Sequence, residues 1–251
     1  MTLREKVVTL KKLENCIALV RMEDRNSKNG FSSELIEDLL EVFNTINYDE
    51  DYKVVVLTGY ENYFATGGTK DTLLKIYENE VKFSDNNIYS VLINCKIPVI
   101  SAMQGHAIGG GFIMGITGDI VILAKESVYT ANFMKYGFTP GMGATYILPY
   151  KIGASLSSEM LLTAENYRGV ELQNRGIPFK VTERNNVLNE ALKLAMTFKD
   201  KPRISLVTLK DRLLANLRNE LPNVINAELK MHDITFHQEK VKENILNRFG
   251  N

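Results

Sequence analysis

The stretch from Pro98 to Ala124, PVISAMQGHAIGGGFIMGITGDIVILA, constrains the fold more than any other part of the chain. A β-rich run, Val99–Met103, is followed by three successive glycines, Gly109–Gly111, then by an apolar helical run and a second β-rich run. The order strand, turn, helix, strand is typical of a βαβ unit. Glycines that open a helix let another group approach the backbone and leave the first N–H groups unpaired. The stretch therefore predicts a binding site for a negatively charged oxygen.

The same order occurs once earlier in the chain. Val54–Thr58 reads as a strand buried on both faces, and a second glycine loop, FATGG at Phe64–Gly68, follows it. Two strand–turn–helix units in the first half predict an α/β fold. Between them, the polar stretch Lys70–Ser84 has a weak helical signal, so we expect a mobile or irregular segment over a cleft.

Further elements follow from hydrophobic periodicity. They comprise a strand at Asn15–Met22, a helix from Ser32 or Ser33 to Ile46, a short strand near Val128–Thr130, a helix at Ala154–Leu162, a strand at Pro178–Val181 and a helix at Val187–Phe198. From residue 202 onward the pattern becomes purely helical and amphipathic, over Ser205–Leu221 and Val224–Phe249. We therefore expect a core of residues 1–200 that carries the active site, and a helical region, residues 201–251, that mediates oligomerisation and covers the site.

Charge and cysteine content exclude several classes of function. The 251 residues carry 30 Lys and Arg against 30 Asp and Glu, which gives no electrostatic argument for binding nucleic acid or an anionic membrane. No apolar run approaches the roughly 20 residues that span a bilayer. Cys16 and Cys95 both lie in apolar runs, so we expect free thiols in a reducing compartment. These features predict a cytoplasmic protein.

The glycine loops do not match phosphate-binding fingerprints. A P-loop requires Lys and Ser or Thr after its last glycine, whereas Gly111 is followed by Phe112. The dinucleotide pattern G-x-G-x-x-G also fails in this stretch. These mismatches argue against nucleotide binding.

Two glycine loops, each after a buried strand, can instead present one backbone N–H each to the same carbonyl oxygen and stabilise charge that develops on it. FATGG at Phe64–Gly68, GHAIGGG at Gly105–Gly111 and PGMG at Pro140–Gly143 resemble the enoyl-CoA hydratase/isomerase (crotonase) superfamily. The resemblance implies a crotonase-like spiral of ββα units with a helical C-terminal appendage. It also implies that Gly68 and Gly110 donate to a thioester carbonyl, and that the chain forms homotrimers or hexamers.

Two positions depart from the pattern of the hydratases in this superfamily. Those enzymes carry one glutamate shortly after the triple glycine and another before PGxG, and use them as acid and base on water. Here the two positions fall on Ile113 and Phe133, and neither side chain can transfer a proton. We therefore expect an apolar substrate pocket that does not add water.

A narrower resemblance covers nearly the whole chain. YTANFMKYGFT at Tyr129–Thr139, Tyr167–Gly169, PRISLVTLK at Pro202–Lys210 and MHDITFH at Met231–His237 look like the decarboxylases of hydroxymethylglutaryl-synthase cassettes, which install β-branches on polyketides. This resemblance implies decarboxylation of a 3-methylglutaconyl thioester to a 3-methylcrotonyl-type thioester. It further implies an acyl carrier protein and the upstream dehydratase of the cassette as partners, and no cofactor beyond the carrier's phosphopantetheine arm.

The same resemblance implies catalytic side chains. Lys82 would hold the substrate carboxylate, although Lys70 or Lys75 in the same segment could replace it. His232 would donate a proton or bind the carboxylate, with a capping or surface histidine as the alternative.

The remaining candidates have subordinate roles. We interpret His106 as a structural histidine within its loop and His237 as a surface residue. Tyr89 and Tyr136 are candidates for supporting contacts only.

Two other functions stay open. An enoyl-thioester isomerase needs the same oxyanion hole but loses no carbon. A catalytically silent protein of this fold would only bind acyl carriers. The missing glutamates are compatible with all three functions.

Overall fold

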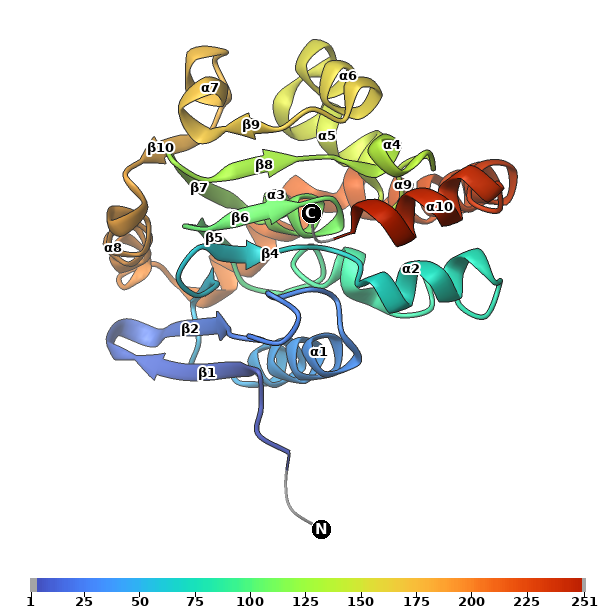
Figure 1. Cartoon of the computed structure of the whole chain (residues 1–251). Helices are drawn as coiled ribbons and strands as arrows, with labels where there is room; N and C mark the ends of the chain where they lie inside the picture. The colour runs from blue at the N-terminus through green and yellow to red at the C-terminus, as the bar shows by residue number, and fades with distance from the viewer. Residues whose placement is uncertain (1–3, 250–251) are drawn as a thin grey trace.

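A computed structural model describes residues 4–249 of the chain (Figure 1). The strands are β1 (Val8–Leu13), β2 (Ile17–Met22), β3 (Val54–Thr58), β4 (Tyr63–Ala65), β5 (Val99–Met103), β6 (His106–Ile108), β7 (Ile120–Ala124), β8 (Val128–Thr130), β9 (Tyr167–Arg168) and β10 (Lys180–Thr182). The helices are α1 (Ser33–Tyr48), α2 (Lys70–Tyr77), α3 (Gly110–Ile116), α4 (Phe133–Tyr136), α5 (Ala144–Ile152), α6 (Ala154–Thr163), α7 (Gly169–Asn174), α8 (Arg184–Ala195), α9 (Arg203–Thr235) and α10 (Glu239–Arg248).

Within the described residues, the strands form two sheets. The larger has the order β1-β2-β3-β5-β7-β10 and is parallel except for the β1–β2 pair. The smaller has the order β4-β6-β8-β9, in which only β8 and β9 run antiparallel. The predicted α/β class is confirmed.

Three successive units, β3-β4-α2, β5-β6-α3 and β7-β8-α4, share one path. In each unit the first strand joins the larger sheet, the second strand joins the smaller one, and a helix follows. Because β4, β6 and β8 are neighbours, the loops that follow these strands meet at one edge of the smaller sheet. The chain is therefore a spiral of ββα units that gathers its glycine loops in one place.

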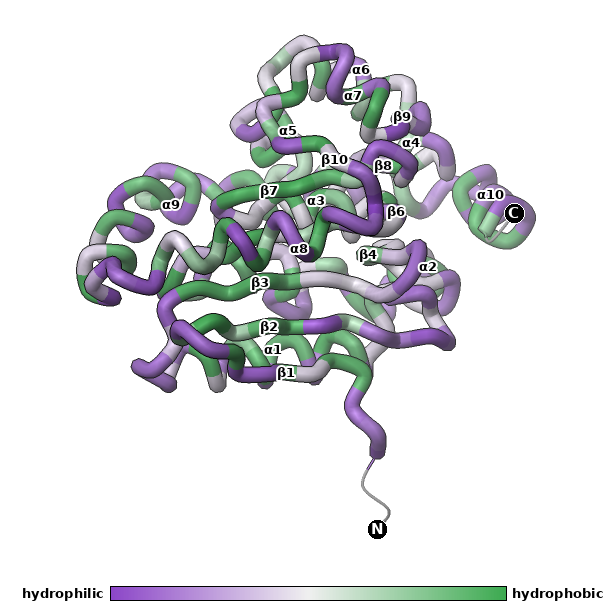
Figure 2. The backbone as a smooth tube through the Cα atoms, turned by 90° about the vertical axis from the view of Figure 1, so that its left-hand side faces the viewer, coloured by the Kyte–Doolittle hydropathy of each residue, from purple (hydrophilic) through white to green (hydrophobic). Residues whose placement is uncertain are grey.

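Apolar residues cover both faces of the larger sheet. Val54 and Val56 face one side and pack with α8, whereas Val55 and Leu57 face the main core. Figure 2 shows α8 lying across the outer face of this sheet. The alternation follows from the two-residue period of a strand, and it explains why these strands read as continuous apolar runs.

The polar segment after Gly68 differs from expectation. Lys70–Tyr77 forms α2 rather than an irregular stretch, because Thr69 caps the helix by accepting a hydrogen bond from the N–H of Thr72 at 3.1 Å. Ile76 is buried and anchors the helix.

The C-terminal region also differs from expectation. A single helix, α9, runs through Pro222, where the sequence predicted a break. Its buried face continues across the proline with Leu217, Leu221 and Ile225. Farther along, α10 packs against α2 and α4.

Smaller differences concern the ends of elements. The chain has an additional first strand, β1, and β2 begins only at Ile17 because Asn15 and Cys16 have positive φ angles of 60° and 61°. The predicted strand at Pro178–Val181 is shifted to β10, and the predicted helix at Val187–Phe198 begins at Arg184. Both cysteines are free thiols. Within residues 4–249, no helix has the length and apolarity needed to cross a bilayer.

Candidate active site

A cavity of about 880 Å³ lies where the glycine loops meet α2, α4 and α9. Five of the six site residues predicted from the sequence line it: Gly68, Lys82, Gly110, Phe133 and His232. Ile113 does not line it, because its fully buried side chain belongs to the main hydrophobic core. The expected contact of Ile113 with substrate is therefore corrected. Neither Ile113 nor Phe133 supplies an acid to this cavity.

Two backbone N–H groups are available at the cavity wall. In the described structure, neither the Gly68 N–H nor the Gly110 N–H has a hydrogen-bond acceptor, and both glycines line the cavity. The loops are in close contact, since a Cβ built on Gly67 would lie 3.0 Å from the Gly110 nitrogen. Gly110 is the first residue of α3, where helical N–H groups lack intrahelical partners. This pair has the character of an oxyanion hole.

The adjacent glycine has a packing role. A Cβ on Gly111 would lie 2.2 Å from the carbonyl oxygen of Ala65, so no side chain fits there. The helix α3 can therefore approach the FATGG loop directly, and the triple glycine combines an N–H donor with a close backbone contact.

His232 lies in an aromatic part of the cavity. It is 7% exposed, and its ring is surrounded by the rings of Phe83, Phe138 and Phe236 at centroid distances of 5.1, 6.0 and 5.1 Å. Its Nε2 lies 2.9 Å from the carbonyl oxygen of Thr139. Burial lowers the pKa of His232 to about 4, so the imidazole is neutral at pH 7 in the empty cavity.

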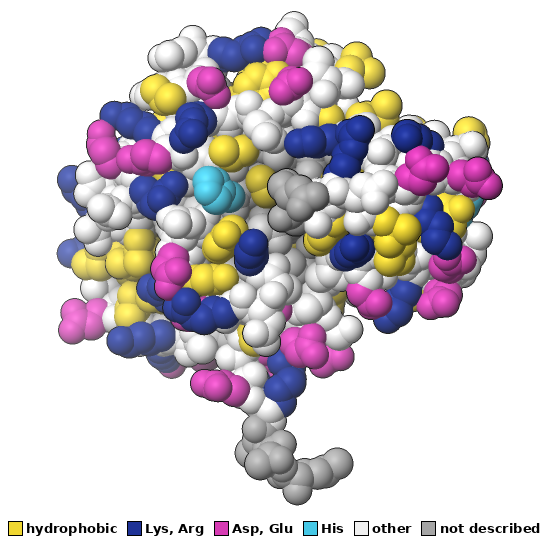
Figure 3. All heavy atoms as spheres, viewed as in Figure 1, with side chains coloured by type: hydrophobic (Ala, Val, Ile, Leu, Met, Phe, Trp, Pro, Cys, Tyr) yellow, Lys and Arg dark blue, Asp and Glu magenta, His cyan; other side chains and the backbone are white. Residues whose placement is uncertain are grey.

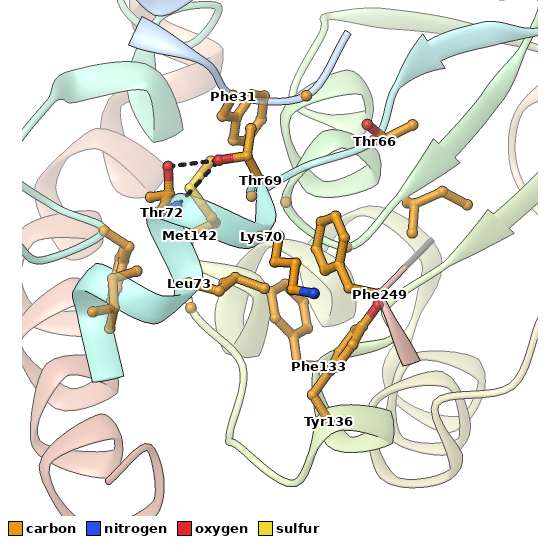
Figure 4. Close-up of a pocket in the computed structure, with 18 of the residues that line it drawn as sticks. Phe31, Thr66, Thr69, Lys70, Thr72, Leu73, Phe133, Tyr136, Met142 and Phe249 are labelled. Carbon is orange, nitrogen blue, oxygen red and sulfur yellow. Dashed lines mark hydrogen bonds between the residues drawn. The ribbon is translucent and has the colours of Figure 1, made fainter. Parts of the chain in front are cut away.

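The three candidate lysines occupy different environments. Lys82 is exposed at the cavity wall, and within residues 4–249 its Nζ has no carboxylate partner. Lys75 forms an ion pair with Asp71 at 2.8 Å. Lys70 points into the cavity, where its Nζ donates to the carbonyl of Leu246 at 3.3 Å (Figure 4).

Lys70 shares its part of the cavity with aromatic side chains. Figure 4 shows Lys70, Phe133, Tyr136 and Phe249 pointing toward one another. Burial raises the pKa of the Tyr136 hydroxyl, which keeps it protonated as a hydrogen-bond donor. Tyr89, the other tyrosine considered, is not among the lining residues.

The cavity wall carries more positive than negative charge. Its cationic residues are Lys28, Lys70, Lys75, Lys82, Lys135 and Arg248, against Asp71 and Asp85. Figure 3 shows Lys and Arg side chains interspersed with Asp and Glu on the face that bears α2 and α10. Because the chain as a whole carries no net charge, this excess is local to the cavity and favours an anionic ligand.

The other two histidines have structural contacts. Nδ1 of His106 accepts a hydrogen bond from the N–H of Val128 at 2.9 Å, as expected for a histidine that holds its loop. His237 is half-buried rather than on the surface, and its Nδ1 lies 2.8 Å from the Tyr77 carbonyl.

Several residues around His232 carry no functional signal in the sequence. Phe83, Phe138, Thr139 and Thr235 contact this residue or its hydrogen-bond acceptor. Thr235 belongs to the MHDITFH motif. Its contact with Thr139 forms only because α9 packs against the segment that leads into the PGMG loop. Only the folded chain brings these two segments together.

Comparisons with known proteins identify the family of the chain. The model of the enoyl-CoA hydratase/isomerase family matches residues 12–249. The chain is 58% identical to the bacillaene synthase decarboxylase PksI of Bacillus subtilis, over 98% of both chains. A probable mitochondrial enoyl-CoA hydratase of Dictyostelium discoideum is 28% identical over 90% of this chain and 82% of its own.

Two solved structures match the chain over nearly its whole length. A structure from a dehydratase/decarboxylase enzyme couple involved in polyketide β-branching matches with a TM-score of 0.97 and 57% identity, over 98% of this chain and all of the other. The ECH2 decarboxylase domain of CurF from Lyngbya majuscula matches with a TM-score of 0.94 and 43% identity, over the same shares. These matches confirm the expectation of a crotonase-fold decarboxylase of β-branching. The chain belongs to the enoyl-CoA hydratase/isomerase family.

Proposed function

We propose that this chain decarboxylates a 3-methylglutaconyl thioester carried on an acyl carrier protein, and releases carbon dioxide and a 3-methylcrotonyl-type thioester. One observation carries the proposal: among residues 4–249, two backbone N–H groups without acceptors, a lysine without a carboxylate partner and a buried imidazole line one cavity, while the hydratase acid positions hold Ile113 and Phe133. The cavity can therefore stabilise an enolate without activating water.

The proposed chemistry uses each part of the cavity. The thioester oxygen accepts hydrogen bonds from the N–H groups of Gly68 and Gly110, each worth roughly 10²–10³ in rate. Lys82 orients the distal carboxylate. When carbon dioxide leaves, the electron pair moves through the conjugated alkene onto the thioester oxygen. His232 then returns a proton to carbon or steers this step.

Aromatic surroundings support loss of the carboxylate. Phe83, Phe133 and Phe138 replace water around the part of the cavity next to His232. A carboxylate placed there loses hydration, whereas neutral carbon dioxide does not depend on it. The apolar wall therefore favours the decarboxylated state.

The carrier arm is proposed to enter between the N-terminal part of α2 and α10. Lys28, Lys135 and Arg248 lie along this part of the wall, and within the described residues none of them forms an ion pair with a carboxylate. They suit the phosphodiester of a phosphopantetheine arm. In this arrangement α10 covers the site, held by the Lys242–Glu78 ion pair and by Asn244, which donates to the Tyr136 carbonyl.

Assembly and location are part of the proposal. Ile204, Leu209 and Leu213 of α9 are 72%, 58% and 63% exposed, which supports contact with further copies in a homotrimer or hexamer. We place the enzyme in the cytoplasm beside the upstream dehydratase, with no cofactor of its own. Within residues 4–249, no three His, Cys, Asp or Glu side chains form a group that could hold a metal ion.

Intact-mass analysis of an acyl carrier protein loaded with 3-methylglutaconyl tests the function. Loss of the mass of carbon dioxide on incubation with enzyme is the expected result. An unchanged mass with a displaced double bond would identify an isomerase, for which the unprotonated nitrogen of His232 could shuttle the proton. No change in either property would leave only carrier binding.

A further inference from the structure

Polar side chains on one face of α9 bind the segment Thr139–Thr145. Glu228, His232 and Thr235 are four and three residues apart, so they share this face. Glu228 holds the C-terminal end of the segment, and His232 and Thr235 hold its N-terminal end. The position of this segment relative to His232 is therefore fixed by the helix that carries His232.

The hydroxyl group of Thr235 fixes Thr139 through two hydrogen bonds. Thr235 Oγ1 donates its single proton to the carbonyl of Met231 at 2.9 Å. It must then accept from both the N–H of Thr139, at 3.2 Å, and the Thr139 hydroxyl, at 2.9 Å. Both bonds hold residue Thr139 itself, and its carbonyl belongs to the next peptide unit.

This carbonyl decides which nitrogen of His232 carries the proton. A carbonyl oxygen only accepts hydrogen bonds, and Nε2 lies 2.9 Å from it, so Nε2 carries a proton and donates. In a neutral ring Nδ1 is then unprotonated. The carbonyl of Pro140 also interacts with the ring and, like that of Thr139, favours its protonated form.

The charged neighbours of His232 leave the ring neutral in the empty cavity. Desolvation by the surrounding aromatic rings lowers its pKa. Asp233 favours the protonated ring and His237 opposes it. Lys82 precedes Phe83, whose ring contacts His232. A substrate carboxylate in the cavity adds a negative charge that favours the imidazolium.

We propose that Thr235 is a positioning residue for His232: acting through Thr139, it holds one proton on Nε2 and reserves Nδ1 for taking a proton from solvent and passing it to the product. This role rests on the proposed function, because it assigns the proton-transfer atom for the same reaction.

The bond between the distal carboxyl carbon and its neighbour breaks, carbon dioxide leaves, and the electron pair moves to the thioester oxygen held by Gly68 and Gly110. As those electrons return, carbon forms a bond to the proton on Nδ1 and the imidazole becomes neutral. Solvent supplies the proton to Nδ1, so each turnover consumes one proton.

Thr235→Val tests the role, because valine keeps the shape of threonine and removes the hydroxyl. Thr235→Ser retains the hydroxyl, and Thr208→Val changes an exposed threonine on the same helix as a control. The tautomer of His232 is read from nitrogen NMR of the unliganded protein with ¹⁵N-labelled histidine, and His232→Gln identifies its signals. Thermal unfolding verifies that each variant is folded.

We expect the wild type and Thr235→Ser to show His232 protonated on Nε2 only, and Thr235→Val to show both tautomers in exchange. In carrier assays, kcat of Thr235→Val should fall about tenfold with little change in KM, part of the roughly 10²–10⁴ contributed by a positioned acid. An unchanged tautomer in folded Thr235→Val would overturn the proposal. The NMR result needs no substrate, so it stands or fails separately from decarboxylation.

Discussion

Glu228 of α9 accepts a hydrogen bond from the N–H of Gly143 at 2.7 Å and so caps α5 from a distant part of the chain. Its other oxygen accepts from the N–H and hydroxyl of Thr145 at 2.9 and 2.7 Å. The carboxylate is fully buried, and that burial raises its pKa. The PGMG loop is thus held by a carboxylate that meets three donors.

Glu228→Gln should destabilise the protein by about 1–3 kcal/mol, because the new amide group places N–H donors opposite N–H donors. Since the folded-state pKa is raised, wild type also loses stability as pH rises above the ordinary value of 4.5, and the variant does not. Urea unfolding across this pH range measures both effects. Glu220→Gln, an exposed change on the same helix, should alter neither.

His232 should make stability pH-dependent in the opposite direction. Its folded-state pKa of about 4 lies below the ordinary 6.5, so its contribution is complete above pH 6.5 and is lost as pH falls toward 4. Relative to His232→Gln, wild type should lose about 3 kcal/mol between pH 7 and pH 4. Equal pH profiles for the two proteins would contradict a buried, neutral imidazole.

Alanine substitutions at the adjacent residues Gly110 and Gly111 should have different effects on activity and stability. In Gly110→Ala the new methyl meets side-chain atoms of Phe31 and Met142 at 3.0 and 3.2 Å, which can adjust. We expect a folded protein whose kcat falls roughly 10²–10³-fold as the N–H donor shifts. In Gly111→Ala the methyl meets the Ala65 backbone, so stability itself should fall by about 1–3 kcal/mol or more. Calorimetry and carrier assays on both variants separate the two roles.

Substitutions of the lysines near the cavity should have different effects on the rate of decarboxylation. Lys82→Gln should slow decarboxylation while leaving product binding unchanged, because the product has no distal carboxylate. Lys75→Gln is the matched control, since Lys75 is already paired with Asp71. Single-turnover rates and product-binding titrations are the measurements. Equal rates for Lys82→Gln and wild type would remove Lys82 from the mechanism and direct attention to Lys70.

Substitution of Lys210 should lower the stability of the protein without changing its turnover. Its Nζ is buried, bonded to the carbonyls of Leu92 and Ile97, and paired with Asp119 at 2.7 Å. Lys210→Met leaves Asp119 without this cation and should cost about 3–5 kcal/mol. Urea denaturation measures the loss, and turnover of the remaining folded protein at low temperature should match wild type.

Sequence patterns predicted the backbone part of the site better than the side-chain part. The glycine loops after buried strands leave a clear local signal, and the family resemblance then implied Gly68 and Gly110, which both line the cavity. The continuation of α9 through Pro222 could not be predicted, because tertiary burial of Leu221 and Ile225 outweighs the local cost of proline.

Side-chain direction was the main difficulty within the site. Ile113 has the sequence position of a hydratase acid, yet its side chain packs in the core. Likewise, the link from Thr235 to His232 depends on Thr139, nearly a hundred residues away in sequence. No pattern along the chain encodes such a meeting of segments.

The pairing of β4 with β6 sets the spacing between the two proposed oxyanion donors, which come from consecutive turns of the spiral. In the proposed reaction, the backbone therefore determines where the enolate forms, independently of any reactive side chain. The residues facing that enolate can change without disturbing this spacing. Under the proposed function, a hydratase and a decarboxylase of this fold would share the same backbone donors and differ in a few side chains.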